Sequence, residues 1–559
     1  MKQKRFNSLT SNGPTFPEEY QSKGLVLNGE KLPVLAEEML WKAARFIGSD
    51  YETEAFAKNG NMWKCLKPEL TKTQQKLQFP ADFLDILNVM KNRQESEKLE
   101  KKATPKEVKL AEKAEKEKIK EIFGTAILDG KKVRLANFAI EAPNWILTRG
   151  KDPRKFCWKY AVTESDVTLN IVNATNPTKL KSVSDATAMW VMKYQIHCGR
   201  PEMSCYKKLN KVIAFHGEVS VRQEAITGKF DTSAKILKNW TKIQTAIRTD
   251  ALKGKDEALV IYLIQETGIR VGGEKDEKKS ALTYGMSTLR GEHMILGNGN
   301  TITFNFLGKD SVPETRTITI DAGIWNVLKK KTFTKGKRIF AEDINVNGYL
   351  KSIMPGITVK NLRTVKCNEV LVNNLKAQKI TANNTEAEKL RAIFEANLEI
   401  AKQMNHQKNV GKNQKEAEGK IEERVTKAKA RVKELKKKHK EKIAKLEIQK
   451  EKFKVAFKGM KILKEKLALI EEQKIKLTAQ MEKAKTAIEK TELALDKKKL
   501  TKDIALGTSL ANYADFRILK SYCDEIALPM EKIFTATQMV AIGKLVENTP
   551  ANFWRNYPS

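Results

Sequence analysis

The residue that could do the most specific chemistry in this chain is a tyrosine near its C-terminal end. Tyr513 closes the stretch that begins at Ile504 and follows a long lysine-rich segment. A phenol oxygen that attacks a phosphodiester leaves a covalent phosphotyrosine, so a cut strand keeps its bond energy and can be resealed without a cofactor. A single tyrosine is more often just a partly buried residue. The hypothesis therefore depends on cationic residues elsewhere in the chain.

Four segments upstream of the tyrosine each carry a cation that phosphoryl transfer could use. They are residues 266–275 with Arg270, 306–311 with Lys309, 360–364 with Arg363 and 404–408 with His406. In-line attack places extra negative charge on the non-bridging oxygens of the phosphate. A guanidinium holds two such oxygens at once and stays charged. Taken singly, each of these four residues has an ordinary explanation as a surface, turn or structural residue. A catalytic site is inferred only if the residues act together, each in a defined role.

The composition points to a polyanionic partner. The chain has 559 residues, with 104 Lys and Arg against 68 Asp and Glu, a formal charge of +36 and a pI near 9.7. This excess is larger than solubility requires, and nucleic acid is the commonest polyanion that such proteins bind. A membrane partner is disfavoured, because there is no run of about 18 apolar residues and no signal peptide at the start.

The cysteines and histidines argue against a metal centre. The six cysteines form no CxxC pair and the five histidines are scattered. We therefore expect free thiols in a reducing, intracellular compartment, with no metal and no other cofactor.

Residues 1–200 mix short strands with helical pieces. Residues 25–32 predict two strands joined by an Asn-Gly turn, and residues 91–122 predict charged, solvated helices interrupted by Pro105. Residues 148–155 form a Gly/Pro loop with four cations, including Arg149 and Lys151, which could grip phosphates.

Residues 201–407 predict one mainly helical domain. Asp231 and Thr232 are expected to cap a helix over 233–240, and the apolar run 257–264 predicts a buried helix. Alternating residues at 301–306 and 317–320 predict a β-hairpin, with Lys309 at or near its tip.

Residues 408–500 form a basic block without proline, with 30 Lys and Arg against 15 Asp and Glu. Its apolar residues recur at helical spacing and predict two helices zipped along a narrow seam, with a turn at Gly459. Two interpretations stay open: a spacer with a solvated surface, or a rod that also attracts DNA. The seam positions are Val425, Val432, Leu435, Ile443, Leu446, Leu467, Ile470, Leu477, Met481, Ala484 and Ile488.

The cationic segments, followed in order by residues 506–509 and by Asn512 beside Tyr513, resemble the active-site segments of the eukaryotic-type DNA topoisomerase IB family. The resemblance extends from Gly13 to residues 529–534. It implies that Arg270 and Arg363 hold the non-bridging oxygens and that His406 donates a further hydrogen bond. Lys309 would protonate the leaving 5′ oxygen, Tyr513 would keep the 3′ phosphate, and no residue is an obvious base.

The resemblance also implies an α+β multidomain clamp on double-stranded DNA. Its parts would be a mixed α/β N-terminal cap (1–200), a mainly helical catalytic domain with the β-hairpin (201–407), an antiparallel coiled-coil linker (408–500) and a small helical C-terminal domain (501–559). A monomer is expected to relax supercoils of either sign without ATP or metal.

Further expectations concern DNA contacts and cellular location. Arg149, Asp310 and Asn512 match the family positions that contact the planar drug camptothecin in the nick, and Lys151 and Lys360 are expected DNA contacts. The family's N-terminal extension is expected to be absent. The protein would lie with chromosomal DNA, in the nucleus of a eukaryote or in the nucleoid of an archaeon or other microbe.

Three local departures from the family are visible: residues 271–273 read Val-Gly-Gly, Phe516 replaces a proline, and the Arg149 loop has fewer arginines. A tyrosine recombinase is the nearest alternative, but that family typically has His-x-x-Arg where this chain has Lys360-x-x-Arg363. A non-catalytic DNA-binding protein is the other alternative, and the intact set of five residues disfavours it.

Overall fold

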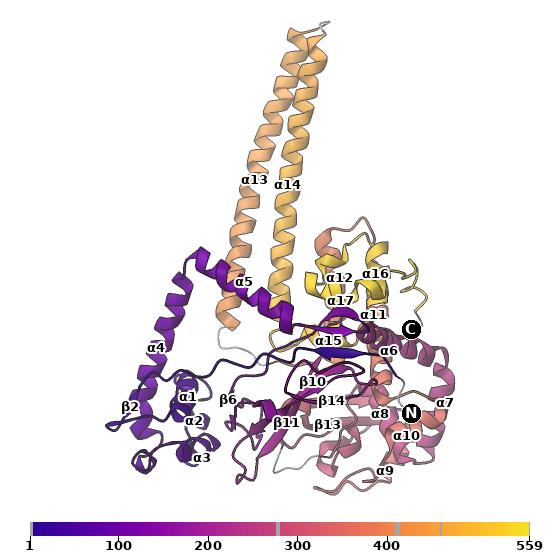
Figure 1. Ribbon diagram of the computed structural model, residues 1–559. Helices are drawn as coiled ribbons and strands as arrows, with labels where there is room; N and C mark the ends of the chain where they lie inside the picture. The colour runs from indigo at the N-terminus through magenta and orange to yellow at the C-terminus, as the bar shows by residue number, and fades with distance from the viewer. Residues whose placement is uncertain (1–3, 275–279, 409–413, 459–460, 558–559) are drawn as a thin grey trace. The chain divides into compact units, whose positions relative to one another are not determined.

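The computed structural model describes residues 4–274, 280–408, 414–458 and 461–557, and it is a mixed α/β, helix-rich protein with several small sheets (Figure 1). The chain forms two compact units. Unit 1 comprises residues 1–229, 270–344 and 540–544, and unit 2 comprises residues 230–269, 345–539 and 545–559. In the parts that the structure describes, no helix has the length and apolar character needed to cross a membrane.

The N-terminal part of unit 1 contains three sheets. An antiparallel sheet has the order β1 (Leu9–Ser11), β4 (Thr125–Leu128), β5 (Lys131–Arg134). A second sheet runs β6 (Asn144–Trp145), β7 (Trp158–Lys159), β10 (Trp190–Cys198), β8 (Val167–Asn170), β9 (Lys181–Val183), with β11 (Lys207–Ala214) also paired to β10. The small hairpin β2 (Val26–Leu27) and β3 (Glu30–Lys31) turns at Asn28 and Gly29, which have φ of 53° and 79°. The predicted Asn-Gly turn is confirmed, because both central residues adopt the positive φ that this hairpin turn requires.

Five helices accompany these sheets: α1 (Val34–Ala43), α2 (Glu52–Ala55), α3 (Asn61–Leu66), α4 (Leu84–Ala103) and α5 (Lys106–Phe123). Pro105 separates α4 from α5, and α5 buries none of its residues, so the predicted solvated helices are confirmed.

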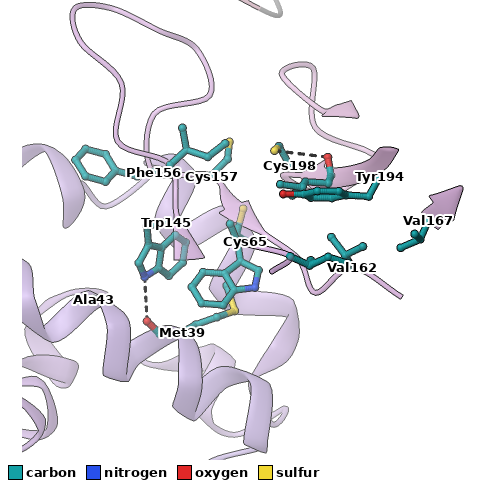
Figure 2. Packing of buried hydrophobic residues seen from close by; sticks show 14 of the residues in the cluster. Met39, Ala43, Cys65, Trp145, Phe156, Cys157, Val162, Val167, Tyr194 and Cys198 are labelled. Atoms are coloured by element: carbon teal, nitrogen blue, oxygen red, sulfur yellow. Dashed lines mark hydrogen bonds between the residues drawn. The ribbon is translucent and has the colours of Figure 1, made fainter. Parts of the chain in front are cut away.

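The buried core of unit 1 contains two tryptophans, Trp145 and Trp158, of which Figure 2 labels Trp145. The rings of Trp145 and Trp158 meet edge to face with centroids 4.8 Å apart. The Trp145 indole N–H donates to the carbonyl oxygen of Met39, 3.0 Å away, so α1 is tied to the sheet. All six cysteines are free, as the sequence predicts, and the structure shows that all six are buried.

The second part of unit 1 carries the predicted β-hairpin. Strand β13 (Thr301–Gly308) pairs with β12 (Met294–Leu296) on one side and β14 (Val312–Thr319) on the other. Lys309 is the first residue of the connection between β13 and β14, so its expected place at the tip is confirmed. The short helix α9 (Ala322–Lys329) follows.

Unit 2 is helical. Its helices before residue 408 are α7 (Trp240–Leu252), α8 (Asp256–Thr267), α10 (Val346–Ile353), α11 (Val359–Ala377) and α12 (Glu386–Gln403). Its last helices are α15 (Leu506–Asn512) and α16 (Phe516–Glu525), and α17 (Ala536–Val546) follows them in the chain. The predicted buried helix over 257–264 is confirmed as the central part of α8.

The predicted helix start at Asp231 and Thr232 is wrong. One continuous helix, α6 (Ser220–Lys238), passes through both residues. The Asp231 carboxylate accepts a hydrogen bond from the Arg517 guanidinium at 2.7 Å instead of capping a helix end. The Asp231 carboxylate, which the local sequence predicts as a helix cap, therefore forms a tertiary ion pair instead.

Two long helices, α13 (Gln414–Ala456) and α14 (Ile462–Leu500), lie alongside each other in unit 2 (Figure 1). Ion pairs between them join residue 422 to 499, 429 to 492 and 447 to 474, so the helices are antiparallel in one register. Every predicted seam position is buried or half-buried. At about 1.5 Å per residue the helices are roughly 58 to 65 Å long. The expected turn at Gly459 lies outside the described residues.

Candidate active site

Tyr513 lies at the end of the short helix α15. Its backbone N–H donates to the carbonyl oxygen of Ser509 at 3.0 Å, and its side chain is 8% exposed. Two residues later, the Asp515 carboxylate accepts the Arg517 N–H at 3.0 Å and caps the start of α16. The tyrosine therefore lies in a tight connection between two helices.

Arg363 contacts the hydroxyl of this tyrosine. It lies in the first half of α11 and is buried. Its Nη1 donates to Tyr513 Oη at 2.8 Å, and its Nε donates to the carbonyl oxygen of Gly268 at 2.8 Å. Gly268 ends α8 in the left-handed conformation, with φ of 72°, which turns its carbonyl away from the helix. A cation thus lies at the phenol oxygen, where it stabilises negative charge.

The imidazole ring of His406 lies beside the ring of Tyr513. Its ring is buried, and its centroid is 5.5 Å from that of the Tyr513 ring. The backbone holds the two segments together, because Ala505 N–H donates to the His406 carbonyl oxygen at 2.7 Å. Lys408 N–H likewise donates to the Asp503 carbonyl oxygen at 2.7 Å, so the chain leaves for α13 and returns from α14 at one place.

Unit 2 therefore brings together three of the five predicted catalytic residues. Arg363, His406 and Tyr513 come from segments up to 150 residues apart in the sequence. Arg270 and Lys309 belong to unit 1 and are described there.

Arg270 begins a segment whose backbone is held closely. Its carbonyl oxygen accepts the Met286 N–H at 2.8 Å, and the carbonyl oxygen of Val271 accepts the Ser287 N–H at 2.8 Å. Gly272 has φ of 95°, and a Cβ on Gly285 would lie 2.4 Å from the Gly272 nitrogen. The close approach of the two backbones therefore requires glycine at both Gly272 and Gly285. The Arg270 side chain is half-buried.

Lys309 and Asp310 are exposed at the hairpin tip. The loop over 148–155 reaches this tip, because a Cβ on Gly150 would lie 2.6 Å from the Ser311 Cβ. Gly150 has φ of 64°, which favours glycine at this contact. The predicted DNA contacts Arg149, Lys151 and Asp310 thus come from two adjacent loops of unit 1.

The four cations of that loop divide into two pairs. Arg154 donates through Nη2 to Asp152 at 2.7 Å, and Lys155 pairs with Glu54. Although burial raises the pKa of Asp152, its hydrogen bonds from Arg154 lower it overall. Among the residues that the structure describes, Arg149 and Lys151 form no ion pair. Those two side chains are available to an anionic ligand.

The remaining predicted DNA contacts lie on unit 2. Lys360 is exposed and precedes Arg363 by about one turn of α11, and Asn512 is exposed next to Tyr513. Each of these two exposed residues therefore lies within one helical turn of a buried residue of the Arg363, His406 and Tyr513 cluster.

Sequence reasoning missed two polar residues beside the tyrosine, Asn368 and Asp515. The sequence around Asp515 could have indicated its role, since an aspartate before a segment with periodic apolar residues is a typical helix cap. The sequence around Asn368 could not, because a buried asparagine inside a helix cannot be distinguished in the sequence from any other polar residue. Across the described ranges, no group of three or more His, Cys, Asp and Glu side chains is arranged to hold a metal ion.

Comparison with known families gives matches along most of the chain. Residues 4–199 match the family model "Eukaryotic DNA topoisomerase I, DNA binding fragment", and residues 218–439 match "Eukaryotic DNA topoisomerase I, catalytic core". Residues 485–542 match "C-terminal topoisomerase domain".

Individual relatives agree with these matches. The chain is 28% identical to DNA topoisomerase 1 of Caenorhabditis elegans over 95% of its own length and 66% of that protein. It is 26% identical to DNA topoisomerase 1 of Drosophila melanogaster, over 96% of this chain and 53% of that protein. It is 27% identical to the mitochondrial DNA topoisomerase I of Rattus norvegicus, over 96% of this chain and 90% of that protein. The chain thus spans about half to two thirds of the first two relatives.

Proposed function

Because the chain belongs to the eukaryotic DNA topoisomerase I family, we propose that it is a type IB topoisomerase. It would relax positive and negative supercoils by cutting one strand, letting it rotate and resealing it. The observation that carries the proposal is the 2.8 Å hydrogen bond from Arg363 Nη1 to Tyr513 Oη, with His406 beside the same ring. A phenol with a fixed cation at its oxygen is suited to act as a nucleophile.

In the proposed cleavage step, Tyr513 Oη forms a bond to phosphorus while the bond from phosphorus to the 5′ oxygen breaks. Arg363 stabilises the phenol oxygen as its proton leaves to water, and together with Arg270 it neutralises the non-bridging oxygens. His406 donates a further hydrogen bond. Lys309 gives a proton to the leaving 5′ oxygen as general acid. Religation runs the same steps in reverse, so no ATP or metal is required.

We also propose the domain organisation of a DNA clamp. The cap would be residues 1–200, the catalytic domain 201–407, the linker 408–500 and the C-terminal domain 501–559, with α13 and α14 forming an antiparallel coiled coil. The match of residues 4–199 to a DNA binding fragment and the charge of +36 support duplex DNA as the partner. The enzyme would act as a monomer on chromosomal DNA, in the nucleus of a eukaryotic host.

The proposed DNA contacts are the exposed or half-buried polar residues described above: Arg149, Lys151, Asp310, Lys360 and Asn512. The proposal is best supported for Arg149 and Lys151, because neither side chain is neutralised by an ion pair among the described residues. Arginine and lysine at such positions bind phosphates without reading the base sequence.

A plasmid relaxation assay tests the proposal. The purified protein is expected to relax both positively and negatively supercoiled plasmid in excess EDTA and without nucleotide. Strict dependence on magnesium or ATP would point to another class of topoisomerase, and DNA binding without relaxation would point to a non-catalytic protein.

A further inference from the structure

We propose that Asn368 is the positioning residue for the nucleophile, clamping the backbone on both sides of Ala514, at the Tyr513 carbonyl oxygen and the Asp515 N–H. This inference rests on the proposed function, since it assigns how that reaction's tyrosine is aimed. It concerns a buried residue that contacts the main chain around Tyr513 and not its phenol oxygen.

The geometry of the clamp is bidentate. Asn368 is fully buried on α11. Its Nδ2 donates to the carbonyl oxygen of Tyr513 at 3.2 Å, and its Oδ1 accepts the N–H of Asp515 at 2.8 Å. The same Nδ2 donates to the Thr364 carbonyl oxygen at 3.0 Å, which fixes the amide against its own helix. A primary amide is the side-chain group that supplies a donor and an acceptor side by side.

Helix α11 therefore holds the tyrosine at two ends. Arg363 contacts the phenol oxygen at 2.8 Å, and Asn368 contacts the main chain on either side of the next residue. The two residues are five positions apart on one helix, so the distance between the nucleophile's backbone and its cation is set by a rigid element.

The tyrosine's own helix constrains this connection on the amide side, because the Ser509 carbonyl oxygen accepts the Tyr513 N–H at 3.0 Å and the Ala514 N–H at 3.2 Å. Helix α15 has seven residues, of which only Ser509 is buried. Beyond the tyrosine, the chain is fixed by Asp515, which is 1% exposed and held by Arg517. Asn368 links that fixed point to α11. Without it, the peptide after Tyr513 could rotate and displace the phenol oxygen.

Small displacements of this kind slow group transfer strongly, since an error of about 1 Å can reduce a rate about 10²-fold. The experiment compares Asn368→Ala and Asn368→Asp with the parent protein. Asn368→Asp keeps an oxygen for the Asp515 N–H but removes the donor to the Tyr513 carbonyl oxygen. Asn374→Ala is the matched control, because Asn374 lies on the same helix and its amide donates, within the described residues, only to the Val370 carbonyl oxygen at 2.8 Å.

The readout is single-turnover cleavage of a nicked duplex at saturating enzyme, with melting temperature and DNA affinity measured in parallel. We expect the cleavage rate constant of both Asn368 variants to fall about 10- to 100-fold, with DNA affinity and the control unchanged. A purely structural role would lower the burst amplitude and the melting temperature but leave the rate constant of the folded fraction at the parent value. That result overturns the clamp. If the parent protein itself forms no covalent adduct, the proposed function fails instead.

Discussion

Replacing Arg517 by alanine should destabilise the protein far more than replacing its second partner, Asp231. Arg517 donates through Nε and Nη2 to Asp515, whose side chain is 1% exposed, and through Nη1 to Asp231, whose side chain is 48% exposed. Burial lowers the pKa of Arg517, but its hydrogen bonds to Asp515 and Asp231 raise it overall, so it stays charged. Arg517→Ala leaves a buried carboxylate without its cation, which costs about 3–5 kcal/mol. Asp231→Ala removes a solvent-screened partner, which costs about 1 kcal/mol or less.

Thermal unfolding of the full chain measures this difference. Since about 1 kcal/mol shifts Tm by about 2–4 °C in a unit of roughly 150–250 residues, Arg517→Ala should lower Tm by about 6 °C or more. Asp231→Ala should lower it by about 4 °C or less. Arg517→Lys is the matched variant, and it should fall between them, because one ammonium cannot reproduce the planar fork. Equal Tm values for Arg517→Ala and the parent, or an equal loss for Asp231→Ala, would refute the reasoning.

Three further predictions concern the reaction and its DNA. Lys309→Ala should slow cleavage of ordinary DNA by about 10²- to 10⁴-fold, yet cleave a substrate with a 5′-sulfur leaving group nearly normally. Equal losses on both substrates would remove Lys309 from the acid role. Replacing residues 414–500 by a short flexible linker should flatten the salt dependence of DNA affinity if the α13 and α14 rod attracts DNA; an unchanged slope would support a spacer. Camptothecin should increase covalent complex on plasmid DNA, with Asn512→Ser as the comparison, and no drug-dependent rise in an active enzyme would contradict the match at that site.

The elements that the sequence predicts well are those with a local cause. The Asn28-Gly29 turn follows from two residues that accept positive φ. The β13 and β14 hairpin follows from alternation of apolar and polar residues, which pairs strands in register. The seam of α13 and α14 follows from helical spacing of apolar residues over 11 positions. In each case the pattern lies within the element that it predicts.

The prediction that failed had a distant cause. Asp231 looks like a helix cap from its neighbours, but its partner Arg517 is 286 residues away. No local pattern contains that information, because ion pairs between remote helices depend on the tertiary fold.

The sequence predicts the candidate site only in part. The types and order of Arg363, His406 and Tyr513 indicate phosphoryl transfer, and family resemblance names their roles. Neither indicates which atoms meet, such as Arg363 Nη1 at Tyr513 Oη. Asn368 is invisible to sequence reasoning because its contacts with the Tyr513 segment are to backbone atoms about 145 residues away, and backbone atoms carry no sequence signal.

The most direct test of the central claim is the covalent adduct of Tyr513→Phe. The substitution removes the proposed nucleophilic oxygen and its hydrogen bond from Arg363 but keeps the ring packed beside His406. The parent and the variant are mixed with labelled duplex DNA and separated on denaturing gels, with DNA affinity measured in parallel. The account predicts normal DNA binding, no covalent adduct and no plasmid relaxation for the variant. Covalent adduct formed by Tyr513→Phe would contradict it.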